Sequence, residues 1–227
     1  MINEDWKDRT EKLIGKKAIE KLENAKVIIY GIGGVGSFAV EGLTRAGVGN
    51  LVLVDMDKIS TTNINRQIHS DVNTIGKPKI EVMKNRILEI NPAANVEIYN
   101  PRDLTFEEQE LINDSFSYVI DAVDTIKTKI NIIEKAKKVG IRIISAMGTG
   151  NKLDETKFEV ADIYKTDVCP LARIMRKELR KRNIEDVKVV YSKEEPITKE
   201  KTPASISYMP AICGLIISGE VIKDIIK

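Results

Sequence analysis

The stretch KVIIYGIGGVGSFAVEGLTRAGVGNLVLVD, residues 26–55, decides how this chain folds. An apolar run at Val27–Tyr30 leads into a glycine-rich turn and then into a segment with helical periodicity at Val35–Ala46. A second apolar run follows at Leu51–Val54. Strand, turn, helix and parallel strand make one βαβ unit. The sequence therefore predicts an α/β fold, a mostly parallel sheet with helices on both faces.

The turn of this unit carries the features of a nucleotide site. Gly31 permits the tight turn, Gly33 lets a phosphate approach the backbone, and Gly36 lets the helix pack against the strand. The helix then presents unpaired N–H groups and its positive dipole end to an anion. Asp55 follows Gly36 by nineteen residues and is placed to accept hydrogen bonds from a ribose. This Rossmann-like spacing does not by itself choose between a dinucleotide and ATP.

Length and composition narrow the class of protein. The 227 residues fit one large domain or two small ones, and a hydrophobic content of 42% suffices for a buried core. Thirty-six basic against 34 acidic residues exclude a polycation, so any nucleic-acid contact must come from a local patch. Cys169 and Cys213 are too few for a disulfide framework and form no zinc-binding pair, which favours the reducing cytoplasm. From its charged residues we do not expect the start to be a signal peptide. Met209–Ser218 is too short to span a bilayer, so we expect a buried helix there.

Two cations after the glycine unit favour a triphosphate. Arg66 lies in the polar segment Thr61–Gln67, and Lys79 opens a helix predicted over Lys79–Ile90. Both are expected at the carboxyl edge of the sheet, where open α/β sheets keep their ligands. Taken alone, Lys79 would be a solvated helix charge. Together with the glycines and Asp55, the two cations predict a ligand that carries more negative charge than the pyrophosphate bridge of a dinucleotide, as a triphosphate does.

A carboxylate follows the next buried strand, which is predicted at Tyr118–Ile120. Asp124 ends the string DAVD at the carboxyl edge of that strand and is our candidate Mg²⁺ ligand, since Mg²⁺ usually takes one or two carboxylates plus phosphates and water. On local sequence alone, Asp124 is equally well explained as the N-cap of the helix predicted over Thr125–Val139. The two roles are compatible. We expect a nucleotide-binding half at about 1–150 and a smaller substrate-side and crossover part with additional strands at about 151–227.

These residues together resemble a known family. The matching positions, in order and spacing, are Gly31–Gly36, Asp55, Asp57, Thr62–Gln67, Lys79 and Asp124. They are similar to the ATP site of the family that contains ubiquitin-activating enzymes and bacterial sulfur-carrier adenylyltransferases. Within it, the strings at Arg9–Gly15, Thr62–Ile68 and Asp167–Leu171 resemble the branch that dehydrates threonylcarbamoyladenosine in tRNA. The likeness covers nearly the whole chain as a single adenylating domain.

The resemblance implies ATP-dependent cyclisation of threonylcarbamoyladenosine through an acyl-adenylate. It assigns nucleotide binding to Gly31, Gly33, Gly34, Gly36, Asp55, Asp57, Thr62, Asn63, Arg66, Gln67, Lys79 and Asp124. Arg66 and Lys79 would stabilise charge at the α-phosphate, and Asp124 would hold Mg²⁺. It also implies a homodimer in which Arg9 acts in trans at the partner's ATP site. Its partners would be tRNA and, as a further candidate, a sulfur-relay protein, with no membrane involved.

Three other features are candidates of a weaker kind. Cys169 stands where relatives keep a reactive cysteine in a crossover loop, and a helix start favours a thiolate, but intramolecular closure needs no thioester. His69, the single histidine, is either a base or, as we favour, a loop residue with a supporting hydrogen bond. Arg173, Arg176 and Arg180 share a stripe on a predicted helix that suits tRNA phosphates or is simply solvated.

Three other functions compete with tRNA dehydration. A sulfur-carrier adenylyltransferase would act on a small partner that ends in Gly-Gly, and the missing zinc cysteines weigh against it. A nicotinamide oxidoreductase would use Asp55 in the same way but leaves Arg66, Lys79 and Asp124 without a role. A nucleotide sensor without turnover has the same binding residues. AMP release with modified tRNA or with a carrier protein separates the adenylating alternatives.

Overall fold

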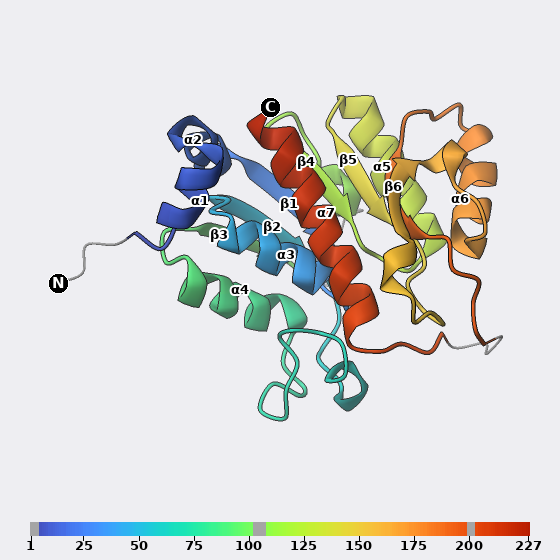
Figure 1. The fold of residues 1–227 in the computed structure, drawn as a ribbon, viewed down its shortest axis with the longest axis horizontal. Helices are drawn as coiled ribbons and strands as arrows, with labels where there is room; N and C mark the ends of the chain where they lie inside the picture. Colours follow the sequence, from blue (N-terminus) through green and yellow to red (C-terminus); the bar gives the residue numbers. More distant parts are fainter. Residues whose placement is uncertain (1–4, 102–107, 199–202) are drawn as a thin grey trace.

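The strands of the computed structural model, which describes residues 5–101, 108–198 and 203–227, lie in one sheet (Figure 1). They are β1 Lys26–Tyr30, β2 Asn50–Val54, β3 Asn95–Tyr99, β4 Tyr118–Asp121, β5 Ile143–Ala146, β6 Phe158–Asp162 and β7 Lys188–Ser192. The strand order is β3-β2-β1-β4-β5-β7-β6, and all neighbours are parallel except β6 and β7. The predicted α/β fold is confirmed. Because β2 and β4 flank β1 on opposite sides, the chain changes direction there, where such sheets open a ligand crevice.

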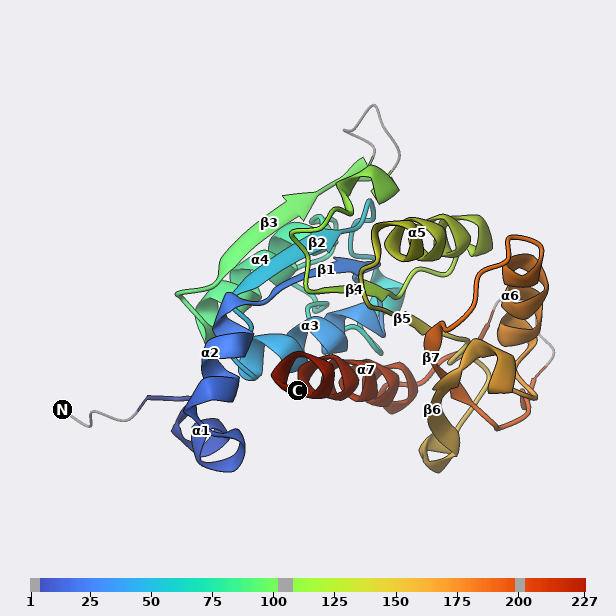
Figure 2. The same ribbon diagram turned by 90° about the horizontal axis from the view of Figure 1, so that it is seen from above.

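Helices cover both faces of this sheet (Figures 1 and 2). The helices are α1 Asp8–Ile14, α2 Lys16–Asn24, α3 Gly36–Arg45, α4 Lys79–Ile90, α5 Ile126–Val139, α6 Pro170–Arg180 and α7 Tyr208–Ile226. Short 3₁₀ turns are η1 Thr61–Asn63, η3 Glu108–Leu111, η4 Glu155–Lys157 and η5 Ile163–Lys165. Helices α2, α3, α4 and α7 pack on one face, and α5 and α6 pack on the other. Among the described residues, no helix is both long and apolar enough to cross a membrane.

The central strands are mainly apolar because both of their faces are covered. In β1, Val27 and Ile29 belong to the core on the α3 side, whereas Ile28 and Tyr30 belong to the core on the α5 side. All four are at most 1% exposed. Successive side chains of a strand point to opposite faces, so a parallel strand between two helical layers needs a continuous apolar run. Each such buried aliphatic side chain stabilises the fold by about 2 kcal/mol.

Helix α7 supports the glycine turn from outside the sheet. The expected buried helix at 209–218 is present and extends to Ile226. A Cβ on Gly214 would lie 2.3 Å from the carbonyl oxygen of Val35, and one on Gly42 would lie 2.2 Å from Ser218 Oγ. Only glycine permits α7 and α3 to approach so closely. The start of α3 is therefore fixed by α7, a contact between two segments that lie far apart in the sequence.

Candidate functional site

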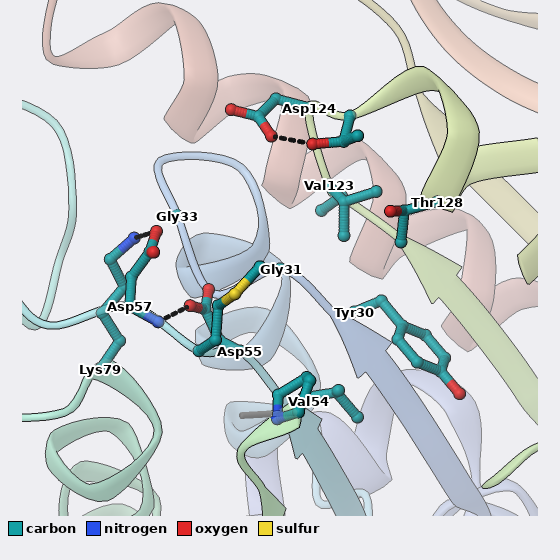
Figure 3. A pocket seen from close by; sticks show the side chains of 14 residues that line it. Tyr30, Gly31, Gly33, Val54, Asp55, Asp57, Lys79, Val123, Asp124 and Thr128 are labelled. Atoms are coloured by element: carbon teal, nitrogen blue, oxygen red, sulfur yellow. Dashed lines mark hydrogen bonds and ion pairs between the residues drawn. The ribbon is translucent and has the colours of Figure 1, made fainter. Parts of the chain in front are cut away.

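A pocket of about 290 Å³ lies at the carboxyl ends of β1, β2 and β4 (Figure 3). Its lining residues are Tyr30, Gly31, Gly33, Val54, Asp55, Met56, Asp57, Lys79, Pro101, Ala122, Val123, Asp124, Thr125 and Thr128. Six of the residues expected to bind nucleotide are among them: Gly31, Gly33, Asp55, Asp57, Lys79 and Asp124. The remaining six, Gly34, Gly36, Thr62, Asn63, Arg66 and Gln67, are outside the lining.

The glycines of the turn have different structural roles. Gly31 has φ +85°, and a Cβ there would lie 2.7 Å from the carbonyl oxygen of Ala122, so the turn requires glycine. A Cβ on Gly36 would lie 1.8 Å from the carbonyl oxygen of Gly31, which is the expected close approach of helix to strand. Gly33 has no atom nearer than 3.9 Å to its missing Cβ and leaves space for a phosphate. Gly34 instead faces Pro210 of α7, whose Cβ would lie 3.0 Å from a Cβ on Gly34.

Asp55 ties the glycine turn to the end of β2. Its Oδ2 accepts a hydrogen bond from the Ile32 N–H at 2.6 Å, and its Oδ1 accepts one from the Asp57 N–H at 2.8 Å. Burial raises the pKa of this carboxyl, and the nearby Lys79 charge acts in the opposite direction. Each carboxylate oxygen has a second lone pair, and the residue lines the pocket. Asp55 is therefore positioned to accept hydrogen bonds from ribose hydroxyls.

Lys79 places a buried cation beside the pocket. Its side chain is 7% exposed, and Nζ lies 2.8 Å from Oδ2 of Asp57, whose carboxylate is 56% exposed (Figure 3). The Lys79 N–H also donates to the Asp57 carbonyl oxygen at 3.0 Å, which fixes the first turn of α4. The side chain of the counterion is thus largely exposed, whereas that of the lysine is largely buried. A phosphate oxygen that displaced Asp57 would meet a poorly hydrated cation, where electrostatic stabilisation is strong.

Arg66 does not converge with Lys79 as the sequence suggested. Its Nη1 donates to the Thr62 carbonyl oxygen and to Oδ1 of Asn65, both at 2.8 Å, and its side chain is half-buried. Thr62 and Asn63 act within the same loop, where Asn63 Oδ1 accepts the Ser60 N–H at 3.0 Å. The guanidinium group is therefore held by its own loop, and a phosphate would have to replace those bonds to engage it.

Several buried polar side chains have no hydrogen-bond partner within the described residues. In the described part of the chain, the buried side-chain atoms without a hydrogen bond are Ser37 Oγ, Gln67 Oε1, both ring nitrogens of His69, and Ser70 Oγ. The supporting hydrogen bond expected for His69 is absent there, so that expectation was wrong. Burial, together with the charges of Lys79 and Arg86, lowers the pKa of His69 to about 4. Its imidazole is 4% exposed and neutral at pH 7.

Asp124 offers one carboxylate to a metal and does not cap α5. The residue is exposed on the pocket wall, and its Oδ1 lies 3.3 Å from the Thr125 hydroxyl. Thr125 is the N-cap, and no side chain caps the helix. The residues described contain no group of three or more His, Cys, Asp or Glu that could hold a metal by themselves. One carboxylate completed by phosphates and water suits Mg²⁺, so the donor set fits that ion.

Arg9 and Cys169 both lie away from the lining of the pocket. Arg9 is exposed on α1, which with α2 precedes the amino end of β1, whereas the pocket is at the carboxyl end of that strand (Figures 1 and 2). Cys169 is the N-cap of α6 and is 1% exposed, a burial that limits access to its thiol. Cys213 is fully buried in α7, where burial raises the pKa of its thiol to about 12.

The arginine stripe on α6 is divided between structure and surface. Arg176 Nη1 donates to the Thr166 carbonyl oxygen at 2.8 Å and so ties the segment before α6 to the helix. Arg180 is exposed and lies over the ring of Tyr164, with its Cζ 5.2 Å from the ring centroid. Arg173 is exposed. Two of the three arginines therefore remain available for an anionic partner.

Several pocket residues were not predicted. Tyr30 and Val54 end their strands, so their position at the carboxyl edge was a usable signal, and Pro101 follows β3 in the same way. Thr128 is the third residue of α5, where nothing local distinguishes it from a surface threonine. Strand ends are therefore more informative than helix interiors when a site of this kind is read from sequence.

Comparison with known proteins gives one consistent family. The sequence matches the ThiF family over residues 8–227. It is 41% identical to the tRNA threonylcarbamoyladenosine dehydratase of Bacillus subtilis, over 96% of this chain and 94% of that protein. It is 37% identical to the Escherichia coli protein of the same name, over 79% of this chain and 68% of that protein. The chain spans 63% of the Haemophilus influenzae relative, a smaller share than for the other two.

Solved structures agree with these sequence relatives. The E. coli tRNA N6-threonylcarbamoyladenosine dehydratase TcdA in complex with AMP is similar to this chain with a TM-score of 0.90, and its complex with ATP with a TM-score of 0.87. Each comparison has 31% sequence identity and covers 99% of this chain and 96% of the other. Those two complexes place adenine nucleotides on a fold like this one.

Proposed function

Because the chain belongs to the ThiF family and, within it, to the tRNA threonylcarbamoyladenosine dehydratases, we propose that it catalyses the ATP-dependent dehydration of threonylcarbamoyladenosine in tRNA. The observation that carries this proposal is the 41% identity along 94% of the B. subtilis relative. The pocket supports it independently, because a glycine turn, Asp55, Lys79 and Asp124 surround one cavity at the switch point of the sheet. The reaction belongs in the cytoplasm, which agrees with two cysteines that are both free and buried.

The chemistry that this pocket must perform has two steps. A carboxylate oxygen of the threonylcarbamoyl group attacks the α-phosphorus of ATP, and the bond from that phosphorus to the β-phosphate oxygen breaks, which releases pyrophosphate. A nitrogen of the same nucleoside then attacks the carbonyl carbon of the acyl-adenylate and loses a proton, while AMP leaves with the former carboxylate oxygen. The nucleophile of the second step is already tethered, so closure has the advantage of an intramolecular reaction.

The side chains divide these tasks by charge. Asp55 holds the ribose, the open space at Gly33 admits the phosphates, and the buried Lys79 stabilises charge that develops at the α-phosphate. Asp124 holds Mg²⁺, which when bound neutralises phosphate charge and orients the triphosphate. Arg66 joins this set once a phosphate replaces Thr62 and Asn65 as its hydrogen-bond acceptors.

We infer a homodimer in which Arg9 completes the partner's site. Helix α1 has no buried residue, and the side chains of Trp6 and Leu13 are 46% and 84% exposed. Since α1 lies beyond the amino end of β1, Arg9 is at the wrong edge of the sheet for its own pocket. Mixing Arg9→Ala with Lys79→Ala subunits should restore about one working site per heterodimer. No recovery above the two parent variants would count against a role in trans.

The tRNA must reach the pocket from the carboxyl edge of the sheet, and we propose that α6 contacts its phosphates. Arg173 and Arg180 are the exposed arginines of the stripe, and exposed cations that replace counterions give nucleic-acid affinity a steep salt dependence. A sulfur-relay protein remains a second candidate partner for this surface. Competition between tRNA and such a protein for binding would place both on the same helix.

The proposal is tested with the purified chain, ATP, Mg²⁺ and tRNA that carries threonylcarbamoyladenosine. We expect AMP and pyrophosphate in equal amounts, and mass spectrometry of the digested nucleosides should show a product that has lost one water. A small carrier protein ending in Gly-Gly is the matched alternative substrate. AMP release with the carrier and none with the modified tRNA would replace our proposal with the sulfur-carrier function.

A further inference from the structure

A buried ion pair stands directly behind the pocket wall. Lys129 extends from the second turn of α5, and Asp121 is the last residue of β4; both side chains are 0% exposed. Lys129 Nζ lies 3.0 Å from Asp121 Oδ2, which also accepts a hydrogen bond from the Ser145 hydroxyl at 2.5 Å. Neither charged residue lines the pocket. Burying two charges is costly even when they are paired, so the pair calls for a role besides stability.

Both members of the pair hold the same residue of the wall. Lys129 Nζ donates a hydrogen bond to the Val123 carbonyl oxygen at 3.1 Å, and the Val123 N–H donates to Asp121 Oδ1 at 3.3 Å. Val123 and Asp124 line the pocket side by side (Figure 3). Ala122 precedes them in the chain, and its carbonyl oxygen lies against Gly31. The backbone N–H of Val123 is thus held by the negative charge of Asp121, and its carbonyl oxygen by the positive charge of Lys129.

We infer that Lys129 and Asp121 form a clamp on Val123 that positions Asp124 for Mg²⁺·ATP. The inference rests on the metal role proposed for Asp124 and adds two positioning residues to it. Asp124 itself is exposed, and its side chain has only a long hydrogen bond from Thr125 among the residues that the structure describes, so its own contacts do not fix its direction. Its orientation must come from the backbone that precedes it. Outer groups that orient a metal ligand commonly change metal affinity by 10- to 100-fold when they are lost, a general range.

The test removes the clamp without leaving an unpaired buried charge. In the double variant Asp121→Asn with Lys129→Met, the asparagine oxygen can still accept the Val123 N–H, and its amide N–H can donate to the Ser145 hydroxyl oxygen. The Val123 carbonyl loses its charged donor. Lys127→Met is the matched control, because Lys127 is an exposed lysine of the same helix. Asp124→Asn is the reference for loss of the ligand. Urea unfolding at the assay temperature verifies that each variant is folded.

The readout is the ATP dissociation constant from calorimetry, measured once with Mg²⁺ and once with a chelator. Their ratio is the Mg²⁺ increment. We expect this ratio to be smaller by about tenfold or more in the double variant than in the wild type, and we expect the same for Asp124→Asn. The ATP affinity of the double variant in the chelator should change little. The Lys127→Met control should keep the wild-type ratio. Because only binding is measured, absence of tRNA dehydration would not affect this result and would count against the proposed function alone.

Two results would overturn the clamp. One is a double variant that keeps the wild-type increment, and the other is an equal loss of affinity with and without Mg²⁺, which indicates a general structural role. A wild-type chain that binds ATP with no Mg²⁺ increment would remove the metal role of Asp124, and the clamp would fall with it. If the single variant Lys129→Arg, which retains a charged donor, recovers the increment, the inference is strengthened.

Discussion

Acid should destabilise this fold through His69, and the His69→Gln variant should lack that part of the loss. The pKa of His69 is lowered to about 4 by burial and by the charges of Lys79 and Arg86. In the unfolded chain the same imidazole has a pKa of about 6.5. Above that pH neither state binds the proton, so stability is unaffected. As the pH falls below it, only the unfolded chain takes up the proton, and stability is lost until the folded chain is also protonated.

The size of the effect follows from these two pKa values. One pKa unit corresponds to about 1.4 kcal/mol, and between about pH 7.5 and about pH 4.5 the linkage amounts to about 2.5 kcal/mol. The assay is urea unfolding of both proteins at the two pH values. The raised pKa of Asp55 acts in the opposite direction but is common to both proteins and cancels in the difference. Stability curves for His69→Gln and wild type that fall in parallel would refute this reasoning.

Four further variants separate the roles of charged and reactive side chains. Lys79→Met should slow acyl-adenylate formation about 100-fold in a single-turnover assay, while stability changes by about 1 kcal/mol or less because its partner carboxylate is exposed. Cys169→Ala should retain dehydration, since the thiol is 1% exposed; complete loss of turnover would restore a nucleophilic role. Arg173→Ala with Arg180→Ala should lower the slope of log affinity for tRNA against log salt by about two. Arg176→Ala should instead lower the free energy of unfolding by about 1 kcal/mol through its bond to the segment before α6.

The strands and helices could be predicted from the sequence where the apolar pattern was long. The helix predicted over 79–90 coincides with α4, and β1, α3 and β2 lie within a residue or so of their expected bounds. Strand β7 was missed because Val189–Tyr191 is a three-residue apolar run, too short to tell from a core segment of another kind. Its place between β5 and β6 depends on long-range pairing. Helix α1 was missed because it buries no residue and so shows no apolar period.

The site residues that could be predicted from the sequence are those that directly follow a strand or begin a helix. Asp55 and Lys79 meet at one pocket because parallel strands bring their carboxyl ends to one edge. The direction of Arg66 was not readable, since its bonds to the Thr62 carbonyl and to Asn65 depend on how the loop turns. Lys129 was missed because a lysine within a helix is usually exposed. Its burial becomes visible only when β4 and α5 are packed together.

The most direct test of the central claim follows the oxygen of the substrate carboxylate. The threonylcarbamoyl carboxylate is labelled with heavy oxygen, and one turnover with ATP is stopped and analysed by mass spectrometry. Attack on the α-phosphorus predicts that one labelled oxygen leaves with AMP and that none is found in pyrophosphate. Label in inorganic phosphate or in pyrophosphate, with unlabelled AMP, would contradict activation of the carboxylate by adenylation.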